Sequence, residues 1–245
     1  MQHAESKTQE EMFTTQNWSA YTAEQHEVWG ILYGRRMEQL GDTASQVFLR
    51  GADAIGLNRD QVPDLKDVNQ RLGEMTGWQS VPVTGFIPAG EFFRCLAERR
   101  FPTTVTLRSR EQLEYLEEPD IFHDIFGHVP LHADTVFADL LQRFGKVAAM
   151  AESEEEITRM ARLFWFTIEF GLVKESGDVK LYGSGLISSI ADGANALSDN
   201  CDRRPFDLDA VMDQHFEIDH LQDVLFVIES FDQLFEAVEV LGGPR

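Results

Sequence analysis

Apolar residues recur at helical spacing along most of the chain. Within residues 22–39, Trp29, Tyr33 and Met37 follow one another at intervals of four residues, which places them on one face of a helix. Comparable patterns predict further helices over residues 135–152, 154–174 and 231–241. These long periodic segments predict a fold built mainly from amphipathic helices.

Segments with the pattern of strands are few and short. Residues 179–182 follow a turn at Gly177 and Asp178, and residues 225–229 form the second candidate. No repeat, linker or low-complexity stretch divides the chain, so one domain is expected. The pattern therefore predicts a mainly helical α+β domain over residues 18–245, preceded by a polar tail over residues 1–17 that need not be ordered.

Two histidines lie in a short apolar segment, residues 119–130, which carries helix-start and helix-stop signals. Asp120 can cap a helix, Gly127 suits a left-handed C-terminal residue, and Pro130 should block any continuation. The segment is therefore expected to form a helix of less than two turns.

The five-residue spacing of His123 and His128 does not suit a regular helix, on which the two side chains would point about 140° apart. If the chain unwinds at Gly127, His128 can turn back towards His123. Both rings can then bind one metal ion, one from the helix end and one from the following loop. We interpret this pair as candidate metal ligands.

Glu169, within the strongly apolar run of residues 163–171, is the candidate third ligand. A buried, unpaired carboxylate costs several kcal/mol or takes up a proton, so an ionised Glu169 needs a cation or strong donors. Two histidines and one carboxylate are typical of non-haem iron(II) enzymes that activate oxygen, but they also bind catalytic zinc. The residues alone leave both metals open, as well as ordinary core or surface roles that involve no metal.

Three segments resemble the aromatic amino acid hydroxylases. They are residues 118–131 (EPDIFHDIFGHVPL), 164–171 (FWFTIEFG) and 182–189 (YGSGLISS). The resemblance extends from Trp18 to Phe231 in the order found in the family. Within the family, the chain resembles the short bacterial phenylalanine 4-hydroxylases.

This resemblance implies a tetrahydropterin-dependent monooxygenase that uses iron(II) and dioxygen to convert L-phenylalanine to L-tyrosine. His123, His128 and Glu169 match the family's iron ligands and would therefore be the catalytic residues. The implied cofactors are Fe(II) and tetrahydrobiopterin or a related reduced pterin. The implied fold is a single catalytic domain, mainly helical, with short strands around a metal cleft.

Four further positions match the family's substrate site. Arg108 corresponds to the arginine that pairs with the substrate carboxylate, for which its planar fork is well suited. Taken alone, Arg108 would be interpreted as a solvated arginine in a basic stretch. Ser188 corresponds to the serine beside that carboxylate, and Trp165 and Phe170 correspond to aromatic residues of the pocket.

Six positions match the family's pterin site: Gly85, Ile87, Phe92, Asp124, Ala161 and Phe164. Phe92 corresponds to the phenylalanine that stacks on the pterin, Gly85 and Ile87 to backbone contacts, and the last three to the opposite wall. Animal relatives carry glutamate in place of Asp124 and tyrosine in place of Phe164. Leu116 and Glu117 likewise depart from the Thr-Pro pair of those relatives.

A second pair of histidines, His215 and His220, repeats the five-residue spacing in a segment whose alternation predicts a half-exposed strand. No glycine interrupts this segment, and the family has no ligands there. We expect both side chains to be solvated or hydrogen-bonded. We also expect His132, which lies beyond Pro130, to have an ordinary role outside the metal site.

Three other functions remain open from the sequence. The same chemistry could act on tryptophan at its 5-position or at the meta carbon of phenylalanine. The fold could serve a non-catalytic metal-binding protein, although the joint presence of the ligands and binding residues argues against that. A zinc hydrolase is the third alternative.

The composition agrees with a compact enzyme. The chain has 245 residues, 43% of them hydrophobic, which is enough for a sizeable core. Its net charge of −21 argues against nucleic acid and anionic membranes as partners. Two cysteines and the lack of a signal peptide or long apolar run predict a cytoplasmic protein. By the resemblance, the chain lacks the regulatory domain and tetramerisation helix of animal relatives, so a monomer is expected.

Overall fold

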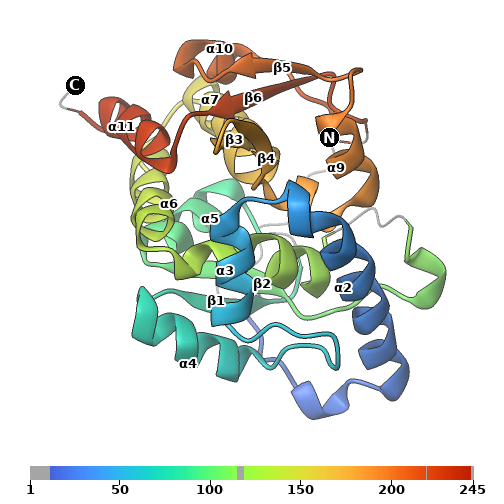
Figure 1. The fold of residues 1–245 in the computed structure, drawn as a ribbon. Coiled ribbons are helices and arrows are strands. Elements are labelled where there is room, and N and C mark those ends of the chain that lie inside the picture. Colours follow the sequence, from blue (N-terminus) through green and yellow to red (C-terminus); the bar gives the residue numbers. More distant parts are fainter. Residues whose placement is uncertain (1–11, 86, 115–118, 219, 244–245) are drawn as a thin grey trace.

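A computed structural model describes residues 12–85, 87–114, 119–218 and 220–243 (Figure 1). Its α-helices are α2 (Ala23–Thr43), α3 (Gln46–Ala54), α4 (Leu65–Met75), α5 (Ala89–Ala97), α6 (Thr135–Ala148), α7 (Glu154–Phe164), α8 (Ser184–Ser188), α9 (Ile190–Leu197), α10 (Leu208–Asp213) and α11 (Phe231–Leu241). Its strands are β1 (Gln79–Val83), β2 (Arg100–Thr104), β3 (Leu172–Glu175), β4 (Asp178–Leu181), β5 (Asp202–Pro205) and β6 (Val224–Ile228). The mainly helical α+β fold is confirmed.

Helix starts follow the capping residues in the sequence. Thr22 and Gln25 form a reciprocal capping box at the start of α2, and Ser153 and Glu156 form another at α7. Ser230 accepts a hydrogen bond from the backbone N–H of the third residue of α11. The predicted helices over residues 22–39, 135–152 and 231–241 are confirmed, with α2 extending to residue 43 and α6 ending at residue 148.

The helix predicted over residues 154–174 is wrong in its last part. The α-helix ends at Phe164, continues as a π-helix over Trp165–Glu169, and is followed by β3. A Cβ atom at Gly171 would lie 2.1 Å from the Thr167 carbonyl oxygen and 2.2 Å from Cζ of Tyr182. The glycine therefore lets Tyr182 pack directly against the end of the π-helix while the chain turns into the sheet.

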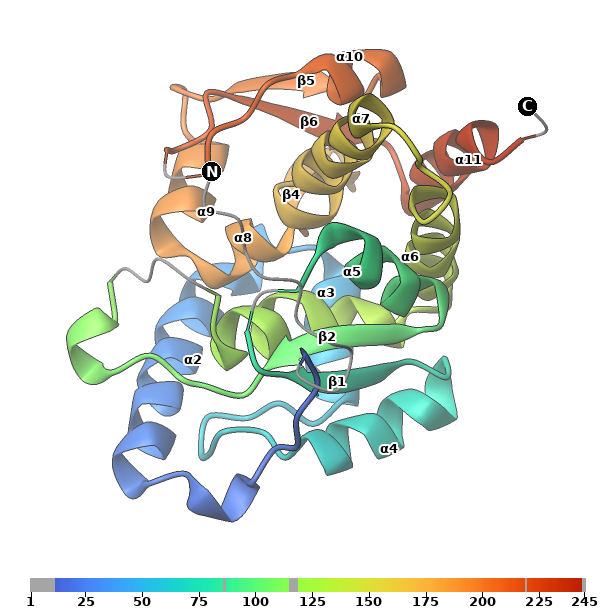
Figure 2. The same cartoon turned by 180° about the vertical axis from the view of Figure 1, so that it is seen from behind.

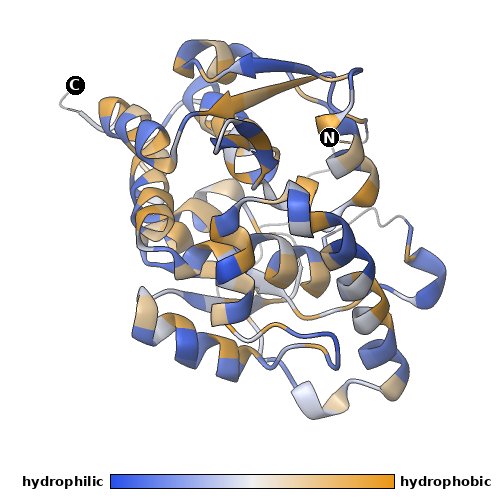
Figure 3. Ribbon diagram, viewed as in Figure 1, coloured by the Kyte–Doolittle hydropathy of each residue, from blue (hydrophilic) through white to orange (hydrophobic). Residues whose placement is uncertain are grey.

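The larger sheet has the order β4-β3-β6-β5, with β3 and β4 antiparallel and the other neighbours parallel. Figure 3 shows the central strand β6 as hydrophobic and the edge strand β5 as hydrophilic, as expected for a buried and an exposed position. The other sheet is a parallel pair of β1 and β2. Figures 1 and 2 show the larger sheet at one end of the molecule and this pair nearer the other.

Part of the predicted N-terminal tail is packed. Phe13 forms an isolated antiparallel bridge with Val83 of β1, and the buried Met12 packs in a small apolar cluster with Val83 and Ile87. The side chain of Gln16 donates to the Pro63 carbonyl oxygen at 3.0 Å. The packed structure therefore extends to residue 12, and residues 1–11 of the predicted tail lie outside the described residues.

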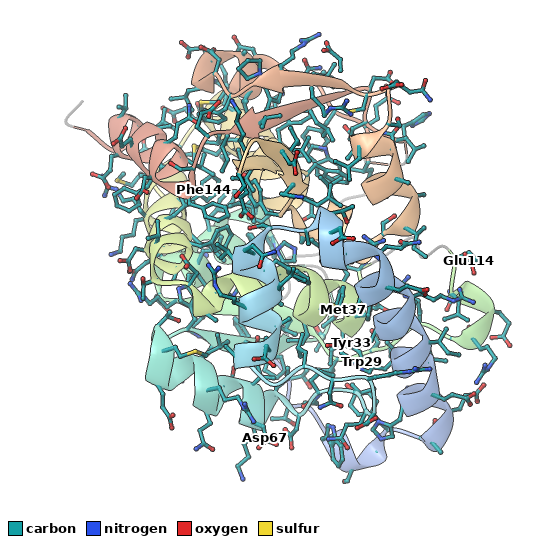
Figure 4. The ribbon with its side chains drawn as sticks, in the orientation of Figure 1. Trp29, Tyr33, Met37, Asp67, Glu114 and Phe144 are labelled. Atoms are coloured by element: carbon teal, nitrogen blue, oxygen red, sulfur yellow. The ribbon has the colours of Figure 1, made fainter. Side chains whose placement is uncertain are left out.

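The apolar face of α2 covers the segment that carries the two central histidines. Trp29 lies edge to face with Phe122, with ring centroids 5.3 Å apart, and Tyr33 lies similarly against Phe126 at 5.5 Å. Figure 4 labels Trp29, Tyr33 and Met37 along this helix. Among the described helices, none is long and apolar enough to cross a membrane.

Candidate metal centre and active site

His123 and His128 lie in a π-helix over Phe122–His128. Because hydrogen bonds in a π-helix join residues five apart, the two histidines lie on the same face. Their ring centroids are 5.0 Å apart. The predicted convergence of these side chains is therefore present, although it arises from the helix type and not from unwinding at Gly127.

The short helix differs from the prediction at Gly127 and Pro130, but not at Asp120. Asp120 accepts a hydrogen bond from the backbone N–H of His123 at 3.1 Å, as expected for a capping residue. Gly127 does not adopt the predicted left-handed conformation. A Cβ atom there would lie 2.9 Å from the Ser184 carbonyl oxygen, so the glycine serves close packing. Pro130 does not end the helical path, because it lies in the first turn of a 3-10 helix over Val129–Ala133.

Glu169, the last residue of the second π-helix, meets both histidines. Its Oε1 lies 3.1 Å from Nε2 of His123, and its Oε2 lies 3.1 Å from Nε2 of His128. One donor atom from each of the three residues lies within 4.8 Å of the others. Two imidazole nitrogens and one carboxylate oxygen thus converge on a common point, which suits a divalent first-row metal.

The electrostatics of this cluster favour a cation. Burial raises the pKa of Glu169, but the neighbouring imidazoles outweigh that effect and hold it well below its usual range. Burial lowers the pKa of His123, yet Glu169, Asp124 and Asp120 together raise it to about 9. In the metal-free protein the site therefore retains a proton at neutral pH, and a metal ion bound there would replace it.

Helix α8 supplies hydrogen bonds to the cluster. Ser188 Oγ lies 2.9 Å from Nδ1 of His123, which leaves Nε2 of that ring facing Glu169. Ser184 Oγ donates to Oε2 of Glu169 at 2.8 Å. The family resemblance predicts Ser188 as a neighbour of the substrate carboxylate. Ser184 lies in the same segment, residues 182–189, but the resemblance implied no role for it.

Arg108 is held by a buried carboxylate. Its Nε donates to Oδ2 of Asp120 at 2.8 Å and its Nη2 donates to Oδ1 at 3.0 Å. The side chain of Arg108 is only 11% exposed, so it is not the solvated arginine that the basic stretch suggested. Burial raises the pKa of Asp120, but the contacts with Arg108 lower it overall. Asp120 therefore fixes the guanidinium while remaining ionised.

Trp165 and Phe170 contact each other, as expected for parts of one aromatic wall, with ring centroids 4.6 Å apart. Behind them, Phe216 stacks on Trp165 at 4.4 Å. The Trp165 indole N–H donates to Oε1 of Gln222 at 3.3 Å. The sequence did not point to Phe216 and Gln222, because both lie some fifty residues further along the chain, outside the three segments that resemble the family.

The six candidate pterin residues lie in the loop after β1, in α5, in the first π-helix and in α7. Phe92 and Phe164 contact each other edge to face at 5.3 Å, so the two rings form one aromatic corner. The side chain of Ile87 is buried, and Ala161 is half-buried in α7. Gly85 has φ of +145°, a conformation that favours glycine. Phe86, within the same motif, lies outside the described residues, as do Leu116, Glu117 and Glu118.

Asp124 faces β2 from the π-helix. Its Oδ2 accepts hydrogen bonds from the backbone N–H of Thr104 at 2.7 Å and from the Thr104 hydroxyl at 2.8 Å. Burial raises the pKa of Asp124 despite these contacts and the nearby histidines. The side chain is thus fixed between the metal cluster and the strand that precedes Arg108.

His132, His215 and His220 are not part of the metal cluster. His215 and His220 are exposed and lie in a loop, so the predicted half-exposed strand is wrong. His220 lies 3.1 Å from a carboxylate oxygen of Glu217, in line with a hydrogen-bonded surface role. His132 is fully buried, and neither of its ring nitrogens has a hydrogen-bond partner among the described residues.

The model of the biopterin-dependent aromatic amino acid hydroxylase family matches residues 11–241. The chain belongs to this family. It is 43% identical to the phenylalanine-4-hydroxylase of Caulobacter vibrioides over 222 residues, which cover 90% of this chain and 76% of that protein. Thus the family resemblance inferred from three motifs is confirmed over nearly the whole sequence.

Two solved structures of phenylalanine hydroxylase from Chromobacterium violaceum share the fold of this family member. One holds iron(III) and oxidised 7,8-dihydrobiopterin, with a TM-score of 0.91 and 41% identity over 95% of this chain and 85% of that chain. The other holds iron and phenylalanine, with a TM-score of 0.88 and 40% identity over the same shares. In both structures this relative therefore holds iron within the fold described here.

Proposed function

We propose that this hydroxylase converts L-phenylalanine to L-tyrosine with dioxygen, using iron(II) and a tetrahydropterin. The observation that carries the proposal is the convergence of His123, His128 and Glu169 on one point. Their three donor atoms leave the remaining metal positions for small molecules. A hydrolytic zinc site is disfavoured because the chain belongs to a family of biopterin-dependent hydroxylases.

Phenylalanine is the proposed substrate because a relative with this fold is known with iron and phenylalanine bound. Arg108 would bind the substrate carboxylate through its guanidinium, which Asp120 holds in place by two hydrogen bonds. Ser188 would lie beside that carboxylate and also fix the ring of His123. Trp165 and Phe170, held as one wall, would contact the aromatic ring of the substrate.

The pterin would lie against the corner formed by Phe92 and Phe164, with backbone contacts from Gly85 and Ile87. Asp124 and Ala161 complete this proposed site. When bound, iron(II) and the reduced pterin together would supply the activation of dioxygen. The chain's own contribution is to orient both organic molecules next to the metal ligands and to limit the access of water, since the side chains of His128 and Glu169 are only 5% and 13% exposed.

We further propose that the protein acts in the cytoplasm as a monomer, with small molecules as its partners and without nucleic acid or membrane contacts. The strong net negative charge of −21 supports the absence of polyanionic partners. Size-exclusion chromatography with light scattering measures the oligomeric state directly.

The proposed reaction is tested by aerobic turnover of iron(II)-loaded protein with a tetrahydropterin, with phenylalanine and tryptophan offered separately. We expect para-tyrosine, formed only when both iron and pterin are present. Formation of 5-hydroxytryptophan would change the proposed substrate to tryptophan. Formation of meta-tyrosine would change the proposed position of hydroxylation on phenylalanine. No product from iron-loaded protein would contradict the proposed activity.

A further inference from the structure

The hydroxyl group of Ser184 contacts the metal cluster from outside the ligand set. Its Oγ donates to Oε2 of Glu169 at 2.8 Å, and the residue is completely buried. Within the part of the chain that the structure describes, the other polar contacts of the Glu169 carboxylate are those to Nε2 of His123 and of His128. A metal ion bound by the three residues would take the place of the two imidazole contacts. The hydrogen bond from Ser184 would remain.

Two neighbouring elements hold Ser184 in place. On one side, α8 lies so close to the π-helix that a Cβ atom at Gly127 would meet the Ser184 carbonyl oxygen at 2.9 Å and its Cβ at 3.2 Å. On the other side, the buried Arg36 of α2 donates from Nε to the Ile187 carbonyl oxygen at 2.7 Å and from Nη2 to that of Leu186 at 2.9 Å. Because both ends of α8 are fixed, the Ser184 hydroxyl has a defined position.

A hydrogen bond to one oxygen of a ligating carboxylate limits its rotation and directs its remaining lone pairs. We propose that Ser184 is a positioning residue for the metal centre, which holds the Glu169 carboxylate in the orientation that suits a cation bound by His123 and His128. This inference rests on the proposed metal site. It assigns a role to a residue that contacts neither the metal nor the substrate.

The experiment compares Ser184→Ala with Ser80→Ala in the full chain. Ser80 is a matched control because it is also buried, and its hydroxyl has no hydrogen-bond partner among the described residues. The metal-free proteins are titrated with Co(II) against a chromophoric chelator, and the visible spectrum of the cobalt complex is recorded. We expect Ser184→Ala to bind Co(II) about tenfold to a hundredfold more weakly, with a changed spectrum, and Ser80→Ala to match the wild type.

A double-mutant cycle separates positioning from general packing. If Ser184 acts through Glu169, then Ser184→Ala added to Glu169→Ala should cause no further loss of Co(II) affinity. An affinity within twofold of the wild type, an unchanged spectrum, or an equal loss in the Glu169→Ala background would each overturn the inference while leaving the metal site intact. Failure of the wild type to bind Co(II) would overturn the inference and the proposed metal site together.

Discussion

Replacing His132 by phenylalanine should stabilise the protein. The ring of His132 is completely buried and packs against the rings of Trp78 and Phe101, with centroids 4.7 Å and 5.0 Å away. Neither ring nitrogen has a hydrogen-bond partner among the described residues. An unsatisfied buried polar group costs about 1–3 kcal/mol, so we expect a gain of about 2 kcal/mol at pH 7. That corresponds to a rise in Tm of roughly 4–8 °C for a domain of this size.

The stability gain of the His132→Phe variant should increase as the pH falls. Burial, with a smaller effect of His128, holds the pKa of His132 well below its ordinary value of 6.5. The native ring therefore stays neutral, while the unfolded chain takes up a proton once the pH falls below 6.5. Stability is lost as the pH falls, by about 1.4 kcal/mol per unit. The His132→Phe variant lacks this group, so its advantage should increase by about 2 kcal/mol between pH 6.5 and pH 5.

The assay is urea unfolding of metal-free protein, followed by circular dichroism at pH 7 and pH 5, because metal binding would add its own stabilisation. His132→Leu is measured alongside, since the larger phenylalanine ring can overpack the site. Tyr182→Phe is the control: the Tyr182 hydroxyl is also buried without a partner, and burial raises its pKa further above neutrality. Its gain should be independent of pH. If both His132 variants are no more stable than the wild type at either pH, the reasoning is refuted.

Other predictions concern the proposed site. His128→Ala and Glu169→Ala should lose tight metal binding. Both variants should keep their far-UV circular dichroism, because the helices bury their own apolar faces. Full metal content in both variants would show that His128 and Glu169 are not ligands. Arg108→Ala should raise the KM for phenylalanine about tenfold to a hundredfold, with Asp120→Asn changing it in the same direction by less; an unchanged KM in steady-state kinetics would contradict the role of Arg108. Phe92→Ala should raise the KM for the pterin selectively, whereas equal losses for both substrates would indicate a packing defect.

Much of the helical framework could be predicted from the sequence. Strong local signals predict three elements: the periodic segments that form α2 and α11, and the short apolar run that forms β6. Thr22 and Ser230 cap their helices as sequence rules expect. The parallel pair of β1 and β2 was missed, since each strand contains a proline, Pro82 and Pro102, and proline argues against a strand.

The candidate ligands were found from the sequence, but the reason that they converge was not. No local sequence signal indicated that residues 122–128 form a π-helix. The close packing of Gly127 against Ser184 joins segments far apart in the chain, and it was not predicted either. The same holds for the supporting hydrogen bonds. Ser184 and Gln222 are ordinary polar residues until the fold brings them to Glu169 and Trp165.

The π-helix that carries His123 and His128 also bears on how such metal sites are recognised in sequences. On an α-helix, two residues four apart differ by only about 40° in direction, and such a pair binds metal in many helices. A π-helix reaches an equivalent arrangement with one additional residue. The number of residues between two helical ligands therefore depends on the type of helix as well as on the kind of metal site. A search restricted to four-residue spacing would pass over chains whose side chains meet just as closely.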